Sequence, residues 1–287
     1  MTNYHNKYFT GERSLFAEHD ATITNTTFGE GESPLKEGKN LKVSHSVFQW
    51  KYPLWYCQHV TVDHTLFETM SRSGIWDTND ITITDSTFQA PKLFRRTNQI
   101  TLVNDYFADA QETLWHCDDV RLEHVQAHGD YFGMDTKHVY ADDLTVVGNY
   151  AFDGAEDVEI HNSTFMTKDA FWNCKNVTIY DSVISGEYLA WNTENLTLIN
   201  CTIQSEQGLC YVKHLRLRNC VLRETTLAFE YCEDVDAEVV STISSVKNPT
   251  SGRIVADGYG EIITDDNQHA GQIELLTWKQ QAERKHA

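Results

Sequence analysis

The sequence predicts an all-β fold: a single-stranded parallel β-helix, or solenoid, of about 12–13 coils. Three observations predict it. A short phrase of residues recurs every 19 to 21 positions along most of the 287-residue chain. Within each phrase apolar and polar residues alternate, which is typical of a β-strand. Helical periodicity is absent before the last twenty residues, and a unit of about 19 residues is too short for a strand, a crossover helix and a return strand.

The phrase ends on a large apolar residue, as in ATITNTTF from Ala21 and LKVSHSVF from Leu41. Its copies begin at Ala21, Leu41, Val60, Ile81, Ile100, Val120, Val139, Val158, Val177, Leu196, Leu215 and Val235, with a weaker copy at Ile254. In a stack of parallel strands, equivalent positions of successive coils lie ~4.8 Å apart. Each position of the phrase therefore becomes a column of neighbouring side chains.

Three columns predict the core and the turns. The seventh position after each start is large and apolar, and its members are Phe28, Phe48, Phe67, Phe88, Phe107, Phe165, Ile184, Ile203 and Leu222. The fourth position is mostly Asn, Asp or His. Because Asn and Asp tolerate left-handed backbone angles, this column predicts a turn in every coil. The sixth position before each start is again apolar, as at Leu54 and Ile75, and predicts a second inward-facing strand.

The two ends of the chain depart from the repeat. We expect residues 1–14 to form an N-terminal cap, residues 15–263 the β-helix, and residues 264–287 a C-terminal tail or cap. The segment QIELLTWKQQAERKHA (272–287) is expected to contain a short amphipathic helix. A β-helix exposes unpaired strand edges at its ends, which recruit other chains unless they are covered. Capping is therefore the preferred interpretation, and docking of a partner is the alternative for the C-terminal segment.

The cysteines and two histidines raise the question of disulfides and metals. One column holds Cys57, Cys117, Cys174 and Cys232. These are three coils apart, about 14 Å, so they can neither cross-link nor share a metal. A disulfide between Cys201 and Cys220, on adjacent coils, is sterically conceivable. His45 and His64 are neighbours that could hold a metal, but Asn and Asp fill their column elsewhere, which favours a turn. We predict no metal and no cofactor.

A fourth column carries chemistry that a core does not need. It lies five positions before each start and contains five of the seven tryptophans. Its members are Phe16, Lys36, Trp55, Trp76, Arg95, Trp115, Met134, Asp153, Trp172 and Trp191. Isolated charges such as Lys36, Arg95 and Asp153 are too costly to bury without partners. The column is therefore predicted to face solvent at least in part.

Polar residues in the neighbouring columns predict a groove beside these tryptophans. Aromatic planes accept the apolar face of a sugar ring, while charged and amide groups bond its hydroxyls. The predicted substrate-binding residues are Trp55, Trp76, Arg96, Glu112, Trp115, Lys168, Asp169, Trp172, Glu187 and Trp191. The alternative is a surface ladder without a ligand, in which Lys168 and Glu187 form a cross-turn ion pair.

Six segments also resemble a known family. They are GESPLK (31–36), KYPLWYC (51–57), APKLFRR (90–96), GDYFGM (129–134), KDAFWNC (168–174) and GEYLAWN (186–192). Together they are similar to an uncharacterised bacterial family, domain of unknown function 3737, over nearly the whole chain. The resemblance implies a pectin-lyase-like, right-handed β-helix. It implies no reaction and no catalytic residues, and likeness of fold to pectate lyases and polygalacturonases is only an associational argument for function.

The first functional hypothesis is a carbohydrate-active enzyme, with Asp135, Asp153, Arg95 and His116 as the catalytic candidates. Hydrolysis needs two carboxyl groups that flank the scissile bond, and Asp135 and Asp153 fall on adjacent coils in neighbouring columns. β-Elimination on a uronic acid needs a cation beside the carboxylate, such as Arg95 or Arg96, and a base such as His116. The hydrolase and lyase classes both stay open.

The second hypothesis is a non-catalytic β-helix that binds a glycan or serves as a scaffold. Its support is the regularity of the repeat, because ladders of like residues can exist for stability alone. An oligosaccharide or sugar conjugate is the predicted partner under the first hypothesis and under the glycan-binding form of the second. A homo-oligomer formed through one end or the acidic flank is compatible with the sequence.

Composition excludes several other classes. The chain has 23 Lys and Arg against 42 Asp and Glu, a formal charge of −19. This excess repels polyanions, so neither nucleic acid nor an anionic membrane is an expected partner. No run of about 18 apolar residues is present that could span a membrane. The start, MTNYHNKYFTGERSLF, lacks the basic and then apolar pattern of a secretory signal, so a cytoplasmic protein is expected.

Overall fold

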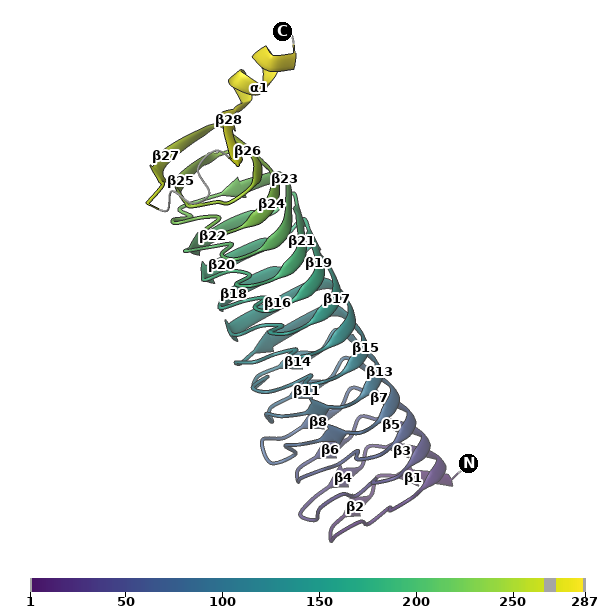
Figure 1. Ribbon diagram of the computed structural model, residues 1–287. Helices are drawn as coiled ribbons and strands as arrows, with labels where there is room; N and C mark the ends of the chain where they lie inside the picture. Colours follow the sequence, from purple (N-terminus) through teal and green to yellow (C-terminus); the bar gives the residue numbers. More distant parts are fainter. Residues whose placement is uncertain (1, 266–271, 286–287) are drawn as a thin grey trace. The chain divides into compact units, whose positions relative to one another are not determined.

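Parallel strands that return to the same place every 19 to 21 residues form the protein (Figure 1). The computed structural model describes residues 2–265 and 272–285. It confirms the predicted fold class, a right-handed parallel β-solenoid, with about 14 turns over the described residues and a short C-terminal helix. The chain divides into an N-terminal unit, Met1–Val147, and a C-terminal unit, Gly148–Ala287.

In the N-terminal unit each coil has a long strand followed, after one bend, by a short strand. The long strands are β1 (Thr2–His5), β3 (His19–Thr24), β5 (Lys39–Ser44), β7 (Gln58–Asp63), β10 (Asn79–Thr84) and β13 (Asn98–Val103). The short ones are β2 (Tyr8–Phe9), β4 (Thr27–Phe28), β6 (Val47–Phe48), β8 (Leu66–Phe67), β11 (Thr87–Phe88) and β14 (Tyr106–Phe107). The two merge in β15 (Asp118–His128) and β16 (Lys137–Asn149), and β9 (Ile75–Trp76) and β12 (Phe94–Arg95) form a third, shorter ladder.

The C-terminal unit repeats this pattern. Its strands are β17 (Glu156–His161), β18 (Thr164–Lys168), β19 (Lys175–Tyr180), β20 (Val183–Glu187), β21 (Glu194–Ile199), β22 (Thr202–Glu206), β23 (Lys213–Leu222), β24 (Glu233–Val239), β25 (Thr242–Lys247), β26 (Gly252–Ala256), β27 (Gly258–Ile263) and β28 (Ile273–Thr277). The helix α1 (Trp278–Lys285) follows β28.

The predicted register is observed directly in the pairing. Ala21 lies opposite Leu41, Leu41 opposite Val60, and Val60 opposite Ile81. The residue four positions after each start adopts a left-handed backbone, with φ of 49° at Asn25 and 50° at His45. Asn, Asp and His are the residues other than glycine that adopt this conformation most readily. The fourth column therefore turns the chain from the long strand into the short one.

Stacked phenylalanines fill the core of the N-terminal unit. Phe28, Phe48, Phe67, Phe88 and Phe107 are each at most 2% exposed. The ring centroids of successive members are 4.8, 5.0, 4.8 and 4.3 Å apart, and the rings are stacked. Burial of one such side chain stabilises the fold by about 1.5–3 kcal/mol. This column confirms the aromatic core expected from the spacing.

The repeat begins earlier than the sequence analysis recognised. Thr2 pairs with Ala21, and Phe9 stacks on Phe28 at 5.6 Å. In this first coil Thr2 and Tyr4 occupy the positions that buried aliphatic residues occupy in later coils. The sequence of the first coil therefore does not match the recurring phrase. The pairing of β1 with β3 and of β2 with β4 nevertheless follows the same register.

At the other end, β28 pairs with β26, and α1 begins directly after it. The indole N–H of Trp278 donates to the carbonyl of Val239 at 2.9 Å, so the helix packs on the last turns of the C-terminal unit. None of the helices that the structure describes has the length and apolar character needed to cross a bilayer.

A buried column of hydroxyl groups lies next to the turns of the N-terminal unit. The backbone N–H of each member donates to the side chain of the next, from Thr65 to Ser86 Oγ at 3.1 Å and from Ser86 to Asp105 Oδ1 at 2.8 Å. Asp105 ends this series, and its Oδ2 has no hydrogen-bond partner. Burial raises the pKa of the Asp105 carboxyl from 3.8 to about 7.

Replacement of a stacked phenylalanine is expected to be strongly destabilising. Phe67→Ala leaves a cavity between Phe48 and Phe88 and should lower the free energy of unfolding by about 3–5 kcal/mol. Leu66→Ala, on the same strand but pointing to the opposite, half-buried side, is the matched control and should cost clearly less. Urea unfolding followed by circular dichroism measures both. Equal losses would contradict the assignment of the Phe column as the core.

Asp105 should make stability depend on pH. Because its pKa is higher in the folded chain, its contribution is fully present below pH 3.8, declines as the pH rises, and is lost once the pH passes about 7. Asp105→Asn keeps the acceptor for Ser86 and does not ionise. From pH 4 to pH 8 the variant should gain about 3 kcal/mol of unfolding free energy relative to the wild type. A pH-independent difference in urea unfolding would show that the carboxyl is not held neutral.

Candidate functional site

The column that contains most of the tryptophans lies on the third side of the coils, which is a short strand in two of them, β9 and β12, and a turn at Trp55, Trp172 and Trp191. In β9 and β12, Ile75 and Phe94 point into the core and are fully buried. The residues that follow them, Trp76 and Arg95, point outward and are half-buried. Arg95 is bridged in turn to Trp115 of the next coil. The alternation of the strand thus presents the column on the outside of the N-terminal unit.

The aromatic rings of this column stack on one another. The indoles of Trp55 and Trp76 are parallel within 10°, with centroids 5.4 Å apart, and Tyr52 lies 4.4 Å from Trp55. The guanidinium of Arg95 lies 4.7 Å from the ring centroids of both Trp76 and Trp115. Both faces of Trp55 and Trp76 are therefore covered by neighbouring side chains, and their partly exposed surface consists of ring edges. The repeat pattern predicts that these faces are available to a sugar ring, whereas in the structure neighbouring side chains occupy them.

The indole N–H groups are also satisfied within the chain. Trp55 donates to the carbonyl of Ser73, Trp76 to that of Lys92 at 3.1 Å, and Trp115 to that of Tyr131 at 2.7 Å. These bonds hold each ring against the loop of the following coil. These bonds therefore fix the positions of the rings. We call the outward surface formed by Trp55, Trp76, Arg95 and Trp115 the platform.

Three cations gather at the centre of this platform. Arg96 forms a bidentate pair with Asp77 at 2.8 and 2.9 Å. Lys92 and Arg95 share one carboxylate, Glu112, at 3.0 and 3.5 Å. The Nε and Nη2 atoms of Arg95 are buried and have no hydrogen-bond partner. In these ion pairs three cations face two carboxylates, which leaves a local positive excess in a chain of net charge −19.

His116 and Asp135 lie beside this cluster. His116 follows Trp115 directly, and its Nδ1 is 3.4 Å from Asp135 Oδ2. About half of each side chain is exposed, 52% for His116 and 43% for Asp135. Comparable pairs occur at other bends of the unit: His59 with Asp80, His124 with Asp143, and His138 with Asp118. The pair of His116 and Asp135 differs from these in lying next to the column of indoles and Arg95.

The C-terminal unit has its own part of the column. Trp172 and Trp191 are half-buried, with centroids 5.7 Å apart and planes tilted by 34°. Tyr211 lies 4.9 Å from Trp191 and stacks on Tyr231 at 5.4 Å. The indole N–H of Trp172 donates to the carbonyl of Tyr188 at 2.6 Å. This stretch is again an aromatic ladder fixed by its own chain.

Charged residues accompany this ladder. Lys168 and Glu187 form an ion pair at 3.3 Å, as the ladder interpretation anticipated. Asp169 is 1% exposed, and neither of its oxygens has a hydrogen-bond partner of good geometry. Burial raises the pKa of Asp169, while Lys168 and the nearby Tyr150 hydroxyl oppose the rise. Within the described residues Asp169 is thus a buried carboxylate with little hydrogen-bond compensation, which is uncommon in folded proteins.

The proposed carboxylate pair is divided between the two units. Asp135 belongs to the N-terminal unit and Asp153 to the C-terminal unit, where it accepts a hydrogen bond from Asn173 at 2.9 Å. The suggestion that these two carboxyls flank a scissile bond stays a prediction.

One exposed cluster has metal-ligating side chains. Ligand atoms of Asp63, His64 and Asp85 lie within 4.8 Å of one another. However, Asp63 Oδ1 already accepts hydrogen bonds from His64 at 2.7 Å and Thr84 at 3.0 Å. His45 and His64 stack with parallel rings 5.0 Å apart, so their nitrogens do not converge on one point. This geometry is that of side chains stacked on successive coils at the turn, as expected for the turn column.

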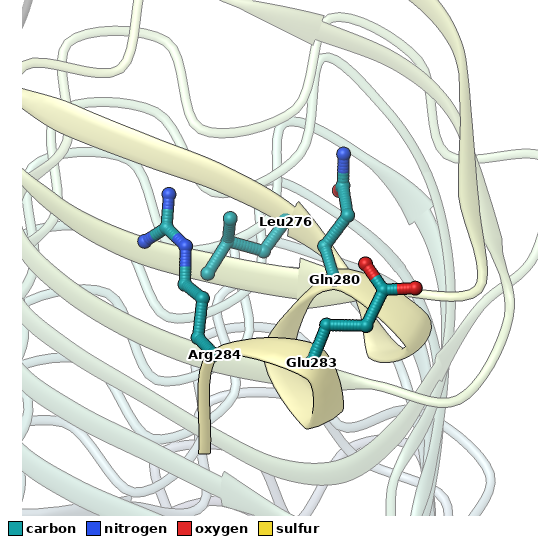
Figure 2. Close-up of a pocket in the computed structure, with 4 residues that line it drawn as sticks. All are labelled: Leu276, Gln280, Glu283 and Arg284. Atoms are coloured by element: carbon teal, nitrogen blue, oxygen red, sulfur yellow. The ribbon is translucent and has the colours of Figure 1, made fainter. Parts of the chain in front are cut away.

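Two hollows lie away from the column. One, between β28 and α1, has a volume of about 320 Å³ and is lined by Leu276, Gln280, Glu283 and Arg284 (Figure 2). The other, in the N-terminal unit, follows the short strands and contains Trp50, which the sequence analysis did not single out. Trp50 comes two positions after Phe48, outside the tryptophan column, and the column pattern therefore passed over it.

Comparisons with known proteins give distant structural neighbours and one family. No curated protein matches the chain in sequence. A surface adhesin of Streptococcus pneumoniae, PfbA, is 10% identical over 81% of this chain and 82% of its own, with a TM-score of 0.48. A tailspike protein of an E. coli bacteriophage, solved with a pentasaccharide, is 9% identical over 95% and 72%, with a TM-score of 0.41. A mannuronan C-5 epimerase module of Azotobacter vinelandii is 10% identical over 96% and 87%, with a TM-score of 0.30.

Similarities this low transfer no activity to the chain. The family comparison reaches further, because the model of the family described as "Protein of unknown function (DUF3737)" matches residues 2–276. This confirms the resemblance carried by the segments from GESPLK to GEYLAWN. The chain therefore belongs to the DUF3737 family.

Proposed function

We propose that the platform of the N-terminal unit binds a short oligosaccharide or sugar conjugate that carries a uronate group. The observation that carries this proposal is the state of Arg95. Its guanidinium is held between two indoles, the one carboxylate that pairs with it, Glu112, is shared with Lys92, and 19% of its side chain is exposed. A ligand carboxylate at the exposed part of the guanidinium would form a charge-assisted hydrogen bond of the strong kind.

The rest of the platform suits a sugar. Glu112, Asp77 and His116 offer acceptors and donors for hydroxyl groups around the cation cluster. The edges of Trp76 and Trp115 supply apolar contact on either side of Arg95. Because the ring faces are covered, face-to-face stacking is not available, and selectivity should come mainly from charge and hydrogen bonds. The overall charge of −19 repels extended polyanions, which favours a short ligand with few acidic groups.

The same residues support a proton-transfer step. With the uronate carboxylate at Arg95, His116 would take the proton from the carbon next to that carboxylate, and Asp135 would orient the imidazole. The electron pair of the C–H bond passes into the carboxylate as an enediolate, whose charge Arg95 stabilises. Elimination follows when the C–O bond on the adjacent carbon breaks and its oxygen leaves with the electron pair and takes the proton from His116, whereas return of a proton to the first carbon gives exchange or inversion. Within the C-terminal unit, Trp172, Trp191, Lys168 and Glu187 are proposed as contacts for a sugar bound to that unit, whereas Asp169 is 1% exposed and would not touch it.

A second candidate is binding without catalysis. It is favoured by the recurrence of His–Asp pairs at bends remote from the platform, such as His124 with Asp143 at 2.8 Å. If the pair of His116 and Asp135 has only the structural role of these other His–Asp pairs, the platform binds the sugar without catalysing a reaction.

Loss of the Arg95 charge should weaken binding of a uronate ligand. Arg95→Gln keeps a planar group between the indoles but removes the cation, so affinity for a galacturonate or glucuronate trisaccharide should fall about 10–100-fold. Isothermal titration calorimetry measures the change. Lys42→Gln, which removes an exposed cation on β5 away from the platform, is the matched control and should leave affinity unchanged. Equal affinity of wild type and Arg95→Gln would refute the site.

Proton transfer can be followed without knowing the final product. In D₂O the wild type should incorporate deuterium next to the uronate carboxylate, detected by NMR. His116→Ala should slow this exchange about 10²–10⁴-fold while affinity stays within a few-fold. His124→Ala, which removes a similar pair elsewhere, should have no effect.

The outcomes separate the candidates. Binding by the wild type without exchange, elimination or hydrolysis of the sugar would establish the non-catalytic alternative. Hydrolysis without exchange, abolished by both Asp135→Asn and Asp153→Asn, would instead support the two-carboxylate mechanism.

A further inference from the structure

The second hollow of the N-terminal unit lies along the residues that directly follow the short strands. Its volume is about 370 Å³. It is lined by three side chains with large apolar surfaces, Tyr8, Trp50 and Met70, and by Glu30, Gln49, Glu68, Thr69 and Gln89. These residues come from five successive coils, so at ~4.8 Å per coil the hollow extends roughly 19 Å along the stack. It is separate in sequence and composition from the Arg95 platform.

Trp50 differs from the tryptophans of the column. Those rings stack on neighbouring aromatic or guanidinium groups, and Trp278 belongs to α1. Within the described residues no aromatic ring contacts Trp50, and its one close cation is Lys51, 5.6 Å from the ring centroid. It is half-buried and lines the hollow. The ring of Trp50 therefore has a face that a ligand can contact, whereas both faces of Trp55 and Trp76 are covered by neighbouring side chains.

Tyr8 forms a preformed wall of the same hollow. Its side chain is 67% exposed, a large solvent contact for an aromatic ring. The ring lies directly against Gly29, because a Cβ at that position would come within 2.5 Å of the Tyr8 hydroxyl and 2.9 Å of its ring. The glycine therefore allows the tyrosine to rest against the backbone of the next coil.

A row of amide and carboxylate groups lies between these aromatic residues. Gln49, Glu68 and Gln89 occupy the same position in three successive coils, one residue after the stacked phenylalanines. Gln49 donates to Glu68 at 3.1 Å, which fixes two members of the row and leaves further donor and acceptor sites. A regular row of this kind matches a chain molecule with hydroxyl groups at regular intervals.

The charge of the lining selects the class of ligand. Glu30 and Glu68 are both acidic, and no lysine or arginine is among the residues that line the hollow. An anionic sugar is therefore disfavoured here, in contrast to the Arg95 platform.

We propose that this hollow is a binding site for a neutral oligosaccharide. The sugar chain runs along the coils, with one pyranose ring stacked on Trp50 and hydroxyl groups bonded to Gln49, Glu68 and Gln89. Mixed aromatic and polar concave surfaces of this size are typical of small-ligand sites. The site is independent of the proposed uronate platform and does not require it.

The test is calorimetric titration of the full chain with neutral tetrasaccharides of glucose, mannose and galactose. At least one should bind with a Kd of about 1 mM or lower. Trp50→Ala should weaken that binding roughly tenfold, and Trp50→Phe should restore part of it. Glu68→Gln, which keeps shape and hydrogen-bonding capacity, should retain binding.

Controls separate this site from the platform and from unfolding. Tyr106→Ala removes an exposed aromatic ring of the same unit outside the hollow and should leave affinity unchanged. Arg95→Gln should not alter binding of the neutral sugar, even if it abolishes uronate binding. Circular dichroism establishes that each variant is folded. No binding of any of these sugars at about 10 mM, or equal affinity of wild type and Trp50→Ala, would overturn the proposal.

Discussion

Hydrogen bonding between successive coils in constant register is the constraint on which the structure depends. Backbone groups of one long strand pair with those of the next, so Leu41 lies between Ala21 and Val60. A slip of one residue would turn every apolar side chain of a strand to the outside. Because register is held, residues about nineteen apart in sequence become contact neighbours, and every column inherits its chemistry from a single position of the repeat.

This constraint explains which features the sequence could predict. The Phe column, the bend at Asn25 and its equivalents, and the outward position of Trp76 follow from spacing and alternation alone. The mutual stacking of the indoles does not, because it depends on side-chain torsions and on the loop carbonyls that bind each N–H. Trp50 escaped detection because it stands in a loop position shared by no other tryptophan. In the first coil, Tyr4 replaces the usual buried aliphatic residue and hides the repeat.

Stacking also decides where ionisable groups can be tolerated. A column of identical polar residues satisfies itself, as the hydroxyl series does from Thr65 to Ser86. Where the residue type changes, buried polar atoms lack hydrogen-bond partners: Oδ2 of Asp105 at the end of that series, and Nε and Nη2 of Arg95 between the indoles. For Asp105 the consequence is a raised pKa. For Arg95 it is a cation compensated largely by aromatic faces, since Glu112 lies 3.5 Å away and is shared with Lys92.

A ladder that stabilises the fold and a surface that binds a ligand are therefore compatible roles for the same residues. The bonds that hold Trp76 and Trp115 against the loops remove the side-chain entropy that a ligand would otherwise have to overcome. The two surfaces of the N-terminal unit differ in how they use aromatic rings. On the platform the faces of Trp76 and Trp115 pack against Arg95, and in the proposed complex charge would provide the selectivity. In the Trp50 hollow the ring is open and the lining charges are negative, so the two surfaces that we propose for acidic and for neutral sugars differ in both aromatic exposure and charge.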